Sequence, residues 1–380
     1  MIEKPSELIY KVLLCIVTLD AALYSTTISE TIKGPLHQLC LAGTLLLAVV
    51  CMLVRRYTTK QFIISMSVLA FGIISYVISG NTDIFISVLI VMLAWKVDIN
   101  DILKTIFCVR LSAFIFTVVM SLAGILEIGT IALSSADKGV MFGYGHANTF
   151  AGNAGILIFL MFAIYRKNLK RIHFTIALMA DFLIFYFSRS RTSLILLTAL
   201  IIMVAFCLKK KRAEVIFKIG KIFLPILLIF VLGLVFLRAK GMCPRFIDIA
   251  DWLLNGRILL AVMNLTYYPI TLLGQRVDLS TIAAHHTYYA LDNGYIYVLI
   301  HYGIVGLFVI CGLAQKAILE CIYKKDAVLC VISMLILCWM VYEGMMISAT
   351  SNFTLLFSVA LINVNNIRFQ KCKRRKLNDT

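Results

Sequence analysis

Long apolar stretches separated by shorter polar ones make up most of the chain. The apolar stretches run to about 17–25 residues, the length that one helix needs to cross a bilayer. We expect about twelve such spans, of which the fourth is the shortest. The pattern predicts an all-α, polytopic membrane protein that forms a single integral membrane domain over residues 1–380. The expected spans begin near Leu8, Leu36, Phe62, Ile84, Leu103, Thr149, Phe174, Ser193, Phe217, Tyr295, Ala327 and Ser348.

One polar stretch, residues 238–294, is much longer than the others. Long loops in compact proteins are usually functional or disordered, and this one has too many apolar and aromatic residues for disorder. We therefore expect it to carry the active site. Its apolar positions from 246 to 265 predict an amphipathic helix at the membrane surface, with Asp248, Asp251 and Asn255 on one face. Its basic residues are Arg238, Lys240, Arg245, Arg257 and Arg276.

The composition is 61% hydrophobic and 14% charged, with a net charge of +17. Lys and Arg concentrate in the loops after even-numbered spans and in the tail at 368–376, which is the positive-inside bias. This distribution predicts cytoplasmic termini, an external 238–294 loop, and a tail near anionic lipid rather than nucleic acid. The 11 cysteines include no Cys-x-x-Cys pair, and most lie within the expected spans. We therefore expect neither a disulfide framework nor a metal site.

Arginines on the expected external turns are candidates for binding an anion. The planar guanidinium of Arg257 binds two oxygens of a phosphate or pyrophosphate at once. Arg189 and Arg191 lie in a tight external turn, where positive charge opposes the usual bias. The structural alternatives for Arg257 are a salt bridge to Asp248 or Asp251, or snorkelling of its side chain to the membrane surface. The alternative for the turn is pairing with Asp181 or another outer carboxylate. Arg276 completes the set of expected substrate contacts.

Histidines near two span entrances are the candidates for proton transfer. His146 lies in a glycine-rich segment beside Asn148, just before a span, where it suits sugar or phosphate contact or a purely structural role. His285 and His286 precede Asp292, and a histidine near a carboxylate suits general-base chemistry on a sugar hydroxyl. The sequence leaves open which of these three groups acts as the base.

Polar residues within the expected spans are also candidates, because they are costly in a membrane. Asn293, Tyr297 and His301 recur at i, i+4 and i+8, and so share one face of the span that begins near Tyr295. Their alternative role is a hydrogen-bonded aromatic belt. Arg110 and Asp181 lie in two other spans, where they have a function or pair with each other.

Several short motifs, taken in order, resemble the Wzy-type bacterial polysaccharide polymerases, a group related to the O-antigen ligases. The first is similar to the family's His-Pro-Asn element, with Ala147 in place of proline. The family's ligases carry a histidine where this chain has Asp292, which favours a polymerase. The matching motifs are GHANTF (145–150), SRT (190–192), GR (256–257), LGQ (273–275), DNGY (292–295) and YGIVGL (302–307).

The resemblance implies an inverting glycosyltransferase of the bacterial plasma membrane that needs no metal or cofactor. The donor would be a glycan on undecaprenyl pyrophosphate, and the acceptor a sugar hydroxyl of another lipid-linked repeat unit. It implies that Arg191 and Arg257 hold the pyrophosphate, and that His285, His286 or Asp292 lies near the acceptor. A flippase and a chain-length regulator would be partners. A ligase and a flippase or transporter of lipid-linked oligosaccharide are the alternative functions.

Overall fold

The computed structural model describes residues 5–55, 57–132, 138–278, 280 and 290–361. This part of the chain is all-α apart from one antiparallel pair, β1 (Thr130–Ala132) and β2 (Lys138–Val140). The helices are α1 (Pro5–Tyr24), α2 (Glu30–Val54), α3 (Thr59–Ser79), α4 (Asp83–Leu93), α5 (Ile99–Leu122), α6 (Ala147–Tyr165), α7 (Arg171–Ser188), α8 (Arg191–Cys207), α9 (Lys210–Ala239), α10 (Pro244–Leu253), α11 (Arg257–Tyr267), α13 (Gly294–Tyr323), α14 (Ala327–Trp339) and α15 (Phe357–Ala360), with 3₁₀ helices η1 (Gly344–Ile347) and η2 (Phe353–Leu356).

Seven of these helices are long and apolar enough to cross a membrane: α2, α3, α5, α6, α7, α9 and α13. The shorter apolar helices include α4, α8 and α14. Helices therefore lie at the expected positions up to Ala327. The last expected span differs, because no continuous helix begins at Ser348. Residues 348–352 are non-helical, and only the short η2 and α15 follow before residue 361.

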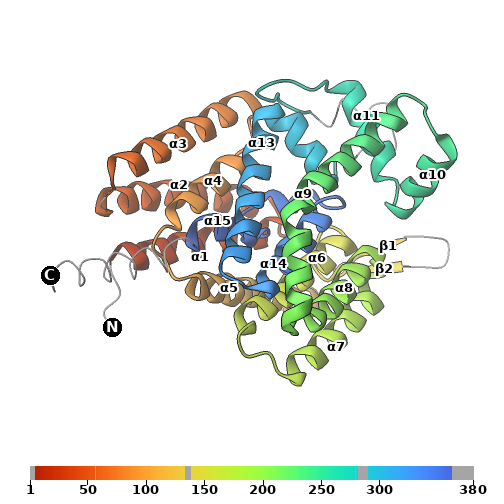
Figure 1. Ribbon diagram of the computed structural model, residues 1–380, viewed down its shortest axis with the longest axis horizontal. Helices are drawn as coiled ribbons and strands as arrows, with labels where there is room; N and C mark the ends of the chain where they lie inside the picture. Colours follow the sequence, from red (N-terminus) through yellow and green to blue (C-terminus); the bar gives the residue numbers. More distant parts are fainter. Residues whose placement is uncertain (1–4, 56, 133–137, 279, 281–289, 362–380) are drawn as a thin grey trace.

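The interhelical turns gather at two ends of the bundle. At the first, which we call the Arg166 end, Arg166 joins three turns: its Nε lies 2.8 Å from Asp326 Oδ2 and its Nη1 lies 2.8 Å from Asn100 Oδ1. At the other, which we call the Asn293 end, the Thr27 amide donates to the Gly143 carbonyl at 2.8 Å. Helices α10 and α11 belong to the Asn293 end and project from one corner of the bundle (Figure 1).

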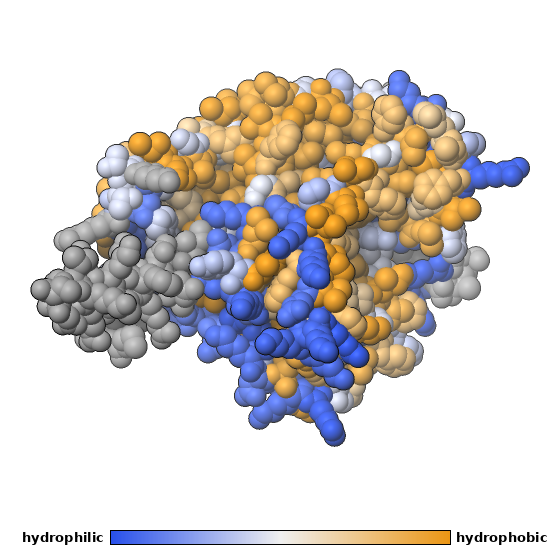
Figure 2. Space-filling model, in the orientation of Figure 1, coloured by the Kyte–Doolittle hydropathy of each residue, from blue (hydrophilic) through white to orange (hydrophobic). Residues whose placement is uncertain are grey.

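Helices α6 and α14 form the centre of the bundle. Trp339 of α14 is fully buried against Phe159 of α6, with ring centroids 5.6 Å apart. Its ring also covers Gly155, where a Cβ would come within 2.4 Å. The outer helices α2, α3 and α7 expose many large apolar side chains, and Figure 2 shows this apolar surface over much of one face. Such extensive exposure is rare on soluble proteins and suits contact with lipid.

Helix α13 is broken at Gly303, which has φ +70° and ψ −170°. Residues 271–275 pack into the break, so that Gly274 and Gly303 meet the opposite backbone directly. A Cβ on Gly274 would lie 2.0 Å from the His301 carbonyl oxygen, and one on Gly303 would lie 2.4 Å from that of Leu272. Two of the resembling motifs are thus adjacent in space. The backbone hydrogen bonds run from Gln275 to His301 (3.2 Å), Ile304 to Thr271 (3.1 Å) and Val305 to Leu272 (3.1 Å).

The expected amphipathic helix over 246–265 is wrong in one respect: it is two helices, α10 and α11. The chain turns sharply between them because Asn255 and Gly256 both have positive φ, +52° and +77°. Asp251 Oδ1 accepts hydrogen bonds from the amides of Ile258 (2.8 Å) and Leu259 (3.2 Å), which satisfies free donors at the start of α11. The three polar residues expected on one face are therefore divided by the turn.

Candidate functional site

Arg257 is the first residue of α11 and is fixed by the turn that precedes it. Its guanidinium is buried, with the side chain 8% exposed. Nη1 lies 3.0 Å from Asp292 Oδ2, and Nε donates to the Tyr342 carbonyl at 3.3 Å. The structural alternative, a salt bridge to Asp248 or Asp251, is therefore wrong, since the carboxylate partner comes from the far end of the 238–294 loop. One side chain holds together three segments that are far apart in the sequence.

Glu343 adds a second carboxyl to this ion pair. It directly follows Tyr342, the residue whose carbonyl Arg257 binds. Burial raises the pKa of Glu343 to about 8, the negative charge of Asp292 raises it as well, and Arg257 opposes the shift. Near neutral pH the site thus holds one carboxylate paired with arginine and one carboxyl that retains its proton. Carboxyls whose environments differ in this way are common at catalytic sites.

His146 approaches the same groups from the start of α6. Its Nδ1 accepts a hydrogen bond from the Asn148 amide at 3.0 Å, which caps the helix. Burial lowers the pKa of His146; the charge of Asp292 opposes this shift and that of Arg257 adds to it. A neutral imidazole that accepts at Nδ1 carries its proton on Nε2. We call His146, Arg257, Asp292 and Glu343 the Arg257 cluster.

The turn at 189–191 lies beside the Arg257 cluster. Asn255 Nδ2 donates to Thr192 Oγ1 at 3.4 Å, which joins this turn to the one before α11. Arg191 is exposed, and no carboxylate pairs with it among the described residues. Arg189 ends α7 in the left-handed conformation, with its guanidinium 5.4 Å from the ring centroid of Tyr186. The expected pairing of this turn with Asp181 is absent from the described contacts.

The three polar side chains predicted on one face of α13 have two different roles. Asn293 is buried and caps the helix, since its Oδ1 accepts from the amides of Tyr295 (3.1 Å) and Ile296 (3.2 Å). Tyr297 and His301 stack, with ring centroids 4.2 Å apart. Both line a separate cavity of about 760 Å³ between α13 and helices α1 to α4, which we call the Tyr297 cavity.

Arg276 belongs to neither the Arg257 cluster nor the Tyr297 cavity. It is exposed, and its side chain lies over Gly80 at the end of α3, beside a shallow depression. His285 and His286 lie outside the described residues. Of the expected site residues, the structure brings His146, Arg257 and Asp292 together, with Asn148 and Arg191 close by. Tyr297 and His301 form a second group.

Arg110 and Asp181 do not pair with each other, contrary to that alternative. Thr198 Oγ1 donates to Asp181 at 2.8 Å. Arg110 is buried, and its Nε donates to the Thr350 carbonyl at 3.0 Å while Nη2 donates to Ser351 Oγ at 2.7 Å. Its Nη1 donates to the amide oxygen of Asn153 at 3.2 Å. The guanidinium is thus satisfied by neutral oxygens.

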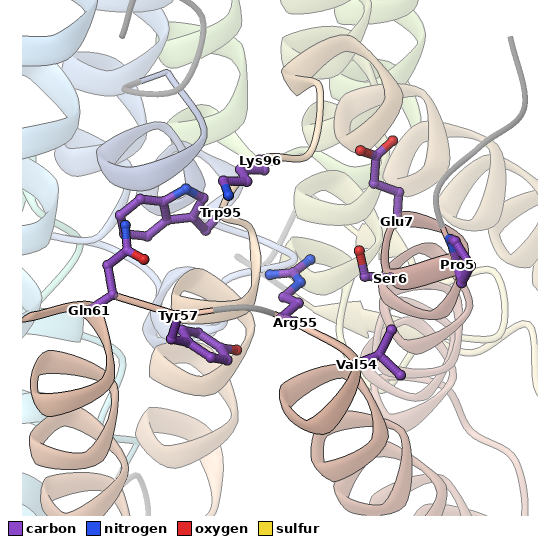
Figure 3. Close-up of a pocket in the computed structure, with 9 residues that line it drawn as sticks. All are labelled: Pro5, Ser6, Glu7, Val54, Arg55, Tyr57, Gln61, Trp95 and Lys96. Carbon is purple, nitrogen blue, oxygen red and sulfur yellow. The ribbon is translucent and has the colours of Figure 1, made fainter. Parts of the chain in front are cut away.

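A third depression, of about 330 Å³, lies at the Arg166 end (Figure 3). Arg55 and Trp95 line it, together with Glu7 at the start of α1. The Arg55 guanidinium is held by the Leu93 carbonyl and lies 5.7 Å from the ring centroid of Tyr10. These contacts give Arg55 a structural role between α1, α2 and the end of α4.

Glu343 is not among the site residues expected from the sequence. Its signal is present, because it is the sole acidic residue between Asp326 and Asp379. No group of three metal-ligating side chains lies together within the described ranges. No known family model matches the chain, and no curated protein or solved structure is found to be similar to it.

Proposed function

We propose that the protein polymerises lipid-linked oligosaccharide repeat units into a surface polysaccharide. The Arg257 cluster is the observation that carries this proposal. Three of the resembling motifs, at 145–150, 256–257 and 292–295, come from separate parts of the chain and supply its members. A shared site gives these three segments a common reason to match the polymerase pattern.

The orientation of the chain supports a reaction at the outer membrane face. We place the Asn293 end outside, because the turns at the opposite end carry the basic residues 166–171 and 209–212. Hydrophilic residues also gather on the lower part of the face shown in Figure 2, over the ends of α7, α9 and α13. On this placement the Arg257 cluster meets lipid-linked donors at headgroup level rather than cytosolic sugar nucleotides.

The proposed reaction is a single displacement. The acceptor hydroxyl oxygen bonds to the anomeric carbon of the donor, the bond from that carbon to the pyrophosphate oxygen breaks, and undecaprenyl pyrophosphate leaves. Arg257 and Arg191 stabilise the charge of the leaving group. When the pyrophosphate binds Arg257, Asp292 loses its partner and accepts the proton of the hydroxyl. The protonated Glu343 keeps a second negative charge away from the incoming phosphates.

The test uses purified protein in liposomes with undecaprenyl-pyrophosphate-linked repeat units. Wild-type protein should produce a ladder of longer chains. Arg257→Ala should reduce the rate by about 10²–10³-fold, the usual loss when one preorganised donor to a developing charge is removed. Arg257→Lys should recover only part of the activity, because an ammonium cannot bind two oxygens as a fork.

Arg238→Ala is the matched control for these variants. Arg238 comes from the same external stretch, but its guanidinium pairs with Asp248 and is more exposed. We expect this variant to lengthen chains at the wild-type rate. Wild-type activity in a folded Arg257→Ala protein would refute the mechanism. Transfer of finished glycan to a different acceptor, without lengthening, would identify a ligase instead.

The break in α13 favours a second candidate, a carrier of lipid-linked oligosaccharide. Transporters often build their sites from discontinuous helices at membrane depth. Gly303 interrupts α13 beside the polar Tyr297 cavity. In liposomes, a carrier would move a fluorescent lipid-linked oligosaccharide from the inner leaflet to a membrane-impermeant quencher outside. A polymerase would lengthen the units without changing their leaflet.

A further inference from the structure

The Tyr297 cavity has features that neither the proposed transfer chemistry nor the Arg257 cluster requires. It lies at the Asn293 end, between α13 and the first four helices, with a volume of about 760 Å³. That size falls in the range of specific small-molecule sites. Its lining is rich in polar groups for a space among apolar helices, and polar residues at membrane depth commonly mark a substrate or ion site. The polar lining therefore makes it a candidate ligand site.

Hydrogen-bonding groups are already oriented around Tyr297. Its hydroxyl donates to Asp83 Oδ2 at 3.2 Å and accepts from the side-chain amide of Asn81. Asp83 is exposed to the cavity and retains further acceptor sites. Across the cavity, His37 Nδ1 lies 2.9 Å from Asp20 Oδ2. The arrangement offers fixed acceptors and donors to a ligand rich in hydroxyl groups.

His301 carries a buried polar atom that has no protein partner. Its side chain is buried, at 9% exposed, and it lines the cavity. Its Nδ1 has no hydrogen-bond partner among the described residues. A buried polar atom without a partner costs about 1–3 kcal/mol, so such atoms are rare in native proteins. Nδ1 is itself shielded from the cavity, so a ligand hydroxyl would reach it only after the imidazole turns toward the cavity.

The cavity also selects by charge. No Lys or Arg lines it within the described residues, whereas Asp20 and Asp83 both do. Arg110 lies behind the cavity wall and donates a hydrogen bond to Ser351 Oγ at 2.7 Å. Because Ser351 Oγ is the acceptor of that bond, its hydroxyl proton is available for donation to a ligand in the cavity. Phosphates and acidic sugars would meet the carboxyl of Asp83, which forms no salt bridge among the described contacts, while Asp20 is paired with His37. An uncharged ligand meets no such penalty.

Aromatic rings complete the lining. Tyr297 stacks on His301, and Tyr24 packs against His37 with ring centroids 5.1 Å apart. An aromatic side chain offers a large apolar face with a polar edge. A sugar ring has the complementary surface, with C–H groups on one face and hydroxyls around its edge. Aromatic faces combined with carboxylate and amide acceptors therefore match a saccharide better than an apolar lipid tail.

The cavity and the Arg257 cluster share one wall. Glu343 belongs to the cluster, and the next two residues, Gly344 and Met345, line the cavity. A Cβ on Gly344 would lie 3.9 Å from the ring of Tyr297. We propose that the Tyr297 cavity binds an uncharged saccharide, the acceptor glycan, and positions its end toward the Arg257 cluster. The identity of this ligand as an acceptor rests on the proposed function.

Binding can be tested without any activity. Saturation-transfer NMR of the full chain in lipid nanodiscs uses methyl β-glucoside, methyl N-acetyl-β-glucosaminide and the acidic methyl β-glucuronide as probes. We expect saturable binding of at least one neutral glycoside and none of the glucuronide. Tyr297→Phe should weaken neutral binding about fivefold to tenfold, the effect of one lost hydrogen bond. Asp83→Asn provides a second test should Tyr297→Phe fold poorly.

Tyr295→Phe is the matched control, because Tyr295 lies on the same helix but donates to the Leu337 carbonyl, away from the cavity. It should bind the glycosides as wild type does. Equal binding of glucuronide, no binding of any neutral glycoside, or equal effects of Tyr295→Phe and Tyr297→Phe would overturn the proposal.

The outcomes also separate this proposal from the polymerase proposal. Glycoside binding that depends on Tyr297, in a protein that never lengthens chains, would refute the polymerase and leave the saccharide site standing. Chain lengthening with an unchanged acceptor KM in a folded Tyr297→Phe protein would refute the acceptor site alone.

Discussion

Replacing Gly274 with alanine tests whether the break in α13 is held by direct backbone packing. Gly274 has φ +92°, which costs a non-glycine residue about 1–2 kcal/mol. The added Cβ would also lie 2.0 Å from the His301 carbonyl oxygen, so the two segments must move apart. Overpacking of this kind costs about 1–3 kcal/mol, and each backbone hydrogen bond broken across the break adds about 1 kcal/mol.

Gly241→Ala isolates the cost of the clash. Gly241 has a similar φ of +65°, but no atom lies within 4 Å of its added Cβ. The two variants share the backbone strain, so Gly274→Ala should be less stable than Gly241→Ala by about 2–4 kcal/mol. At a few degrees per kcal/mol, its unfolding midpoint should lie about 5–10 °C lower.

The chain carries its own reporters for this measurement. Cys311, Cys321 and Cys330 are free and buried, so a thiol-reactive fluorogenic dye labels them only when the bundle opens on heating. Equal midpoints for the two alanine variants would show that the backbone approach at Gly274 does not hold the break. The reasoning about α13 would then be refuted.

Three further predictions use the same thermal assay or the lengthening assay. Glu343 has a pKa of about 8 in the folded protein, against an ordinary value of 4.5. Its contribution to the stability of the folded state is therefore fully present below about pH 4.5 and is lost as the pH rises to about 8. The melting midpoint of Glu343→Gln should therefore vary less between pH 5 and 8 than that of wild type. His146→Ala should cost about 1 kcal/mol through the lost helix cap, while His146→Asn keeps the cap and, if Nε2 serves the reaction, still loses chain lengthening. Arg110→Lys should lower stability by roughly 2 kcal/mol, because an ammonium cannot reproduce the forked hydrogen bonds to Thr350 and Ser351; an unchanged midpoint would contradict this.

The sequence predicts the helices well where a single physical requirement determines the secondary structure. Apolar runs of sufficient length locate α2, α5 and α9, because the backbone must satisfy its own hydrogen bonds in lipid. The turn at Ser188–Arg191 is located for the same reason. The break at Gly303 follows His301 and Tyr302, but a single glycine in a span does not by itself predict a break. It depends on residues 271–275, which are distant in the sequence and pack against it.

The candidate site is predictable in its parts and not in its pairings. His146, Arg257 and Asp292 stand out as polar residues at the ends of apolar runs. Asp248 and Asp251 are the carboxylates nearest to Arg257 in the sequence, and so were the structural alternatives for its partner. The turn at Asn255 and Gly256 instead commits Asp251 to capping α11, which leaves Arg257 to Asp292. Only the three-dimensional fold decides between such equivalent carboxylates.

Arg110 explains why the chain departs from a helix after Ser348. Carbonyl and hydroxyl oxygens of the segment 348–352 accept hydrogen bonds from this buried guanidinium. They replace the hydrogen bonds to water that the guanidinium loses on burial. A backbone carbonyl that accepts a hydrogen bond from a guanidinium is less able to accept the amide hydrogen bond of the next helical turn. The charge in α5 therefore shapes a segment some 240 residues away in sequence. Removing it with Arg110→Leu would release these oxygens and allow the continuous helix that the apolar sequence favours, at the expense of the Ser351 wall of the Tyr297 cavity.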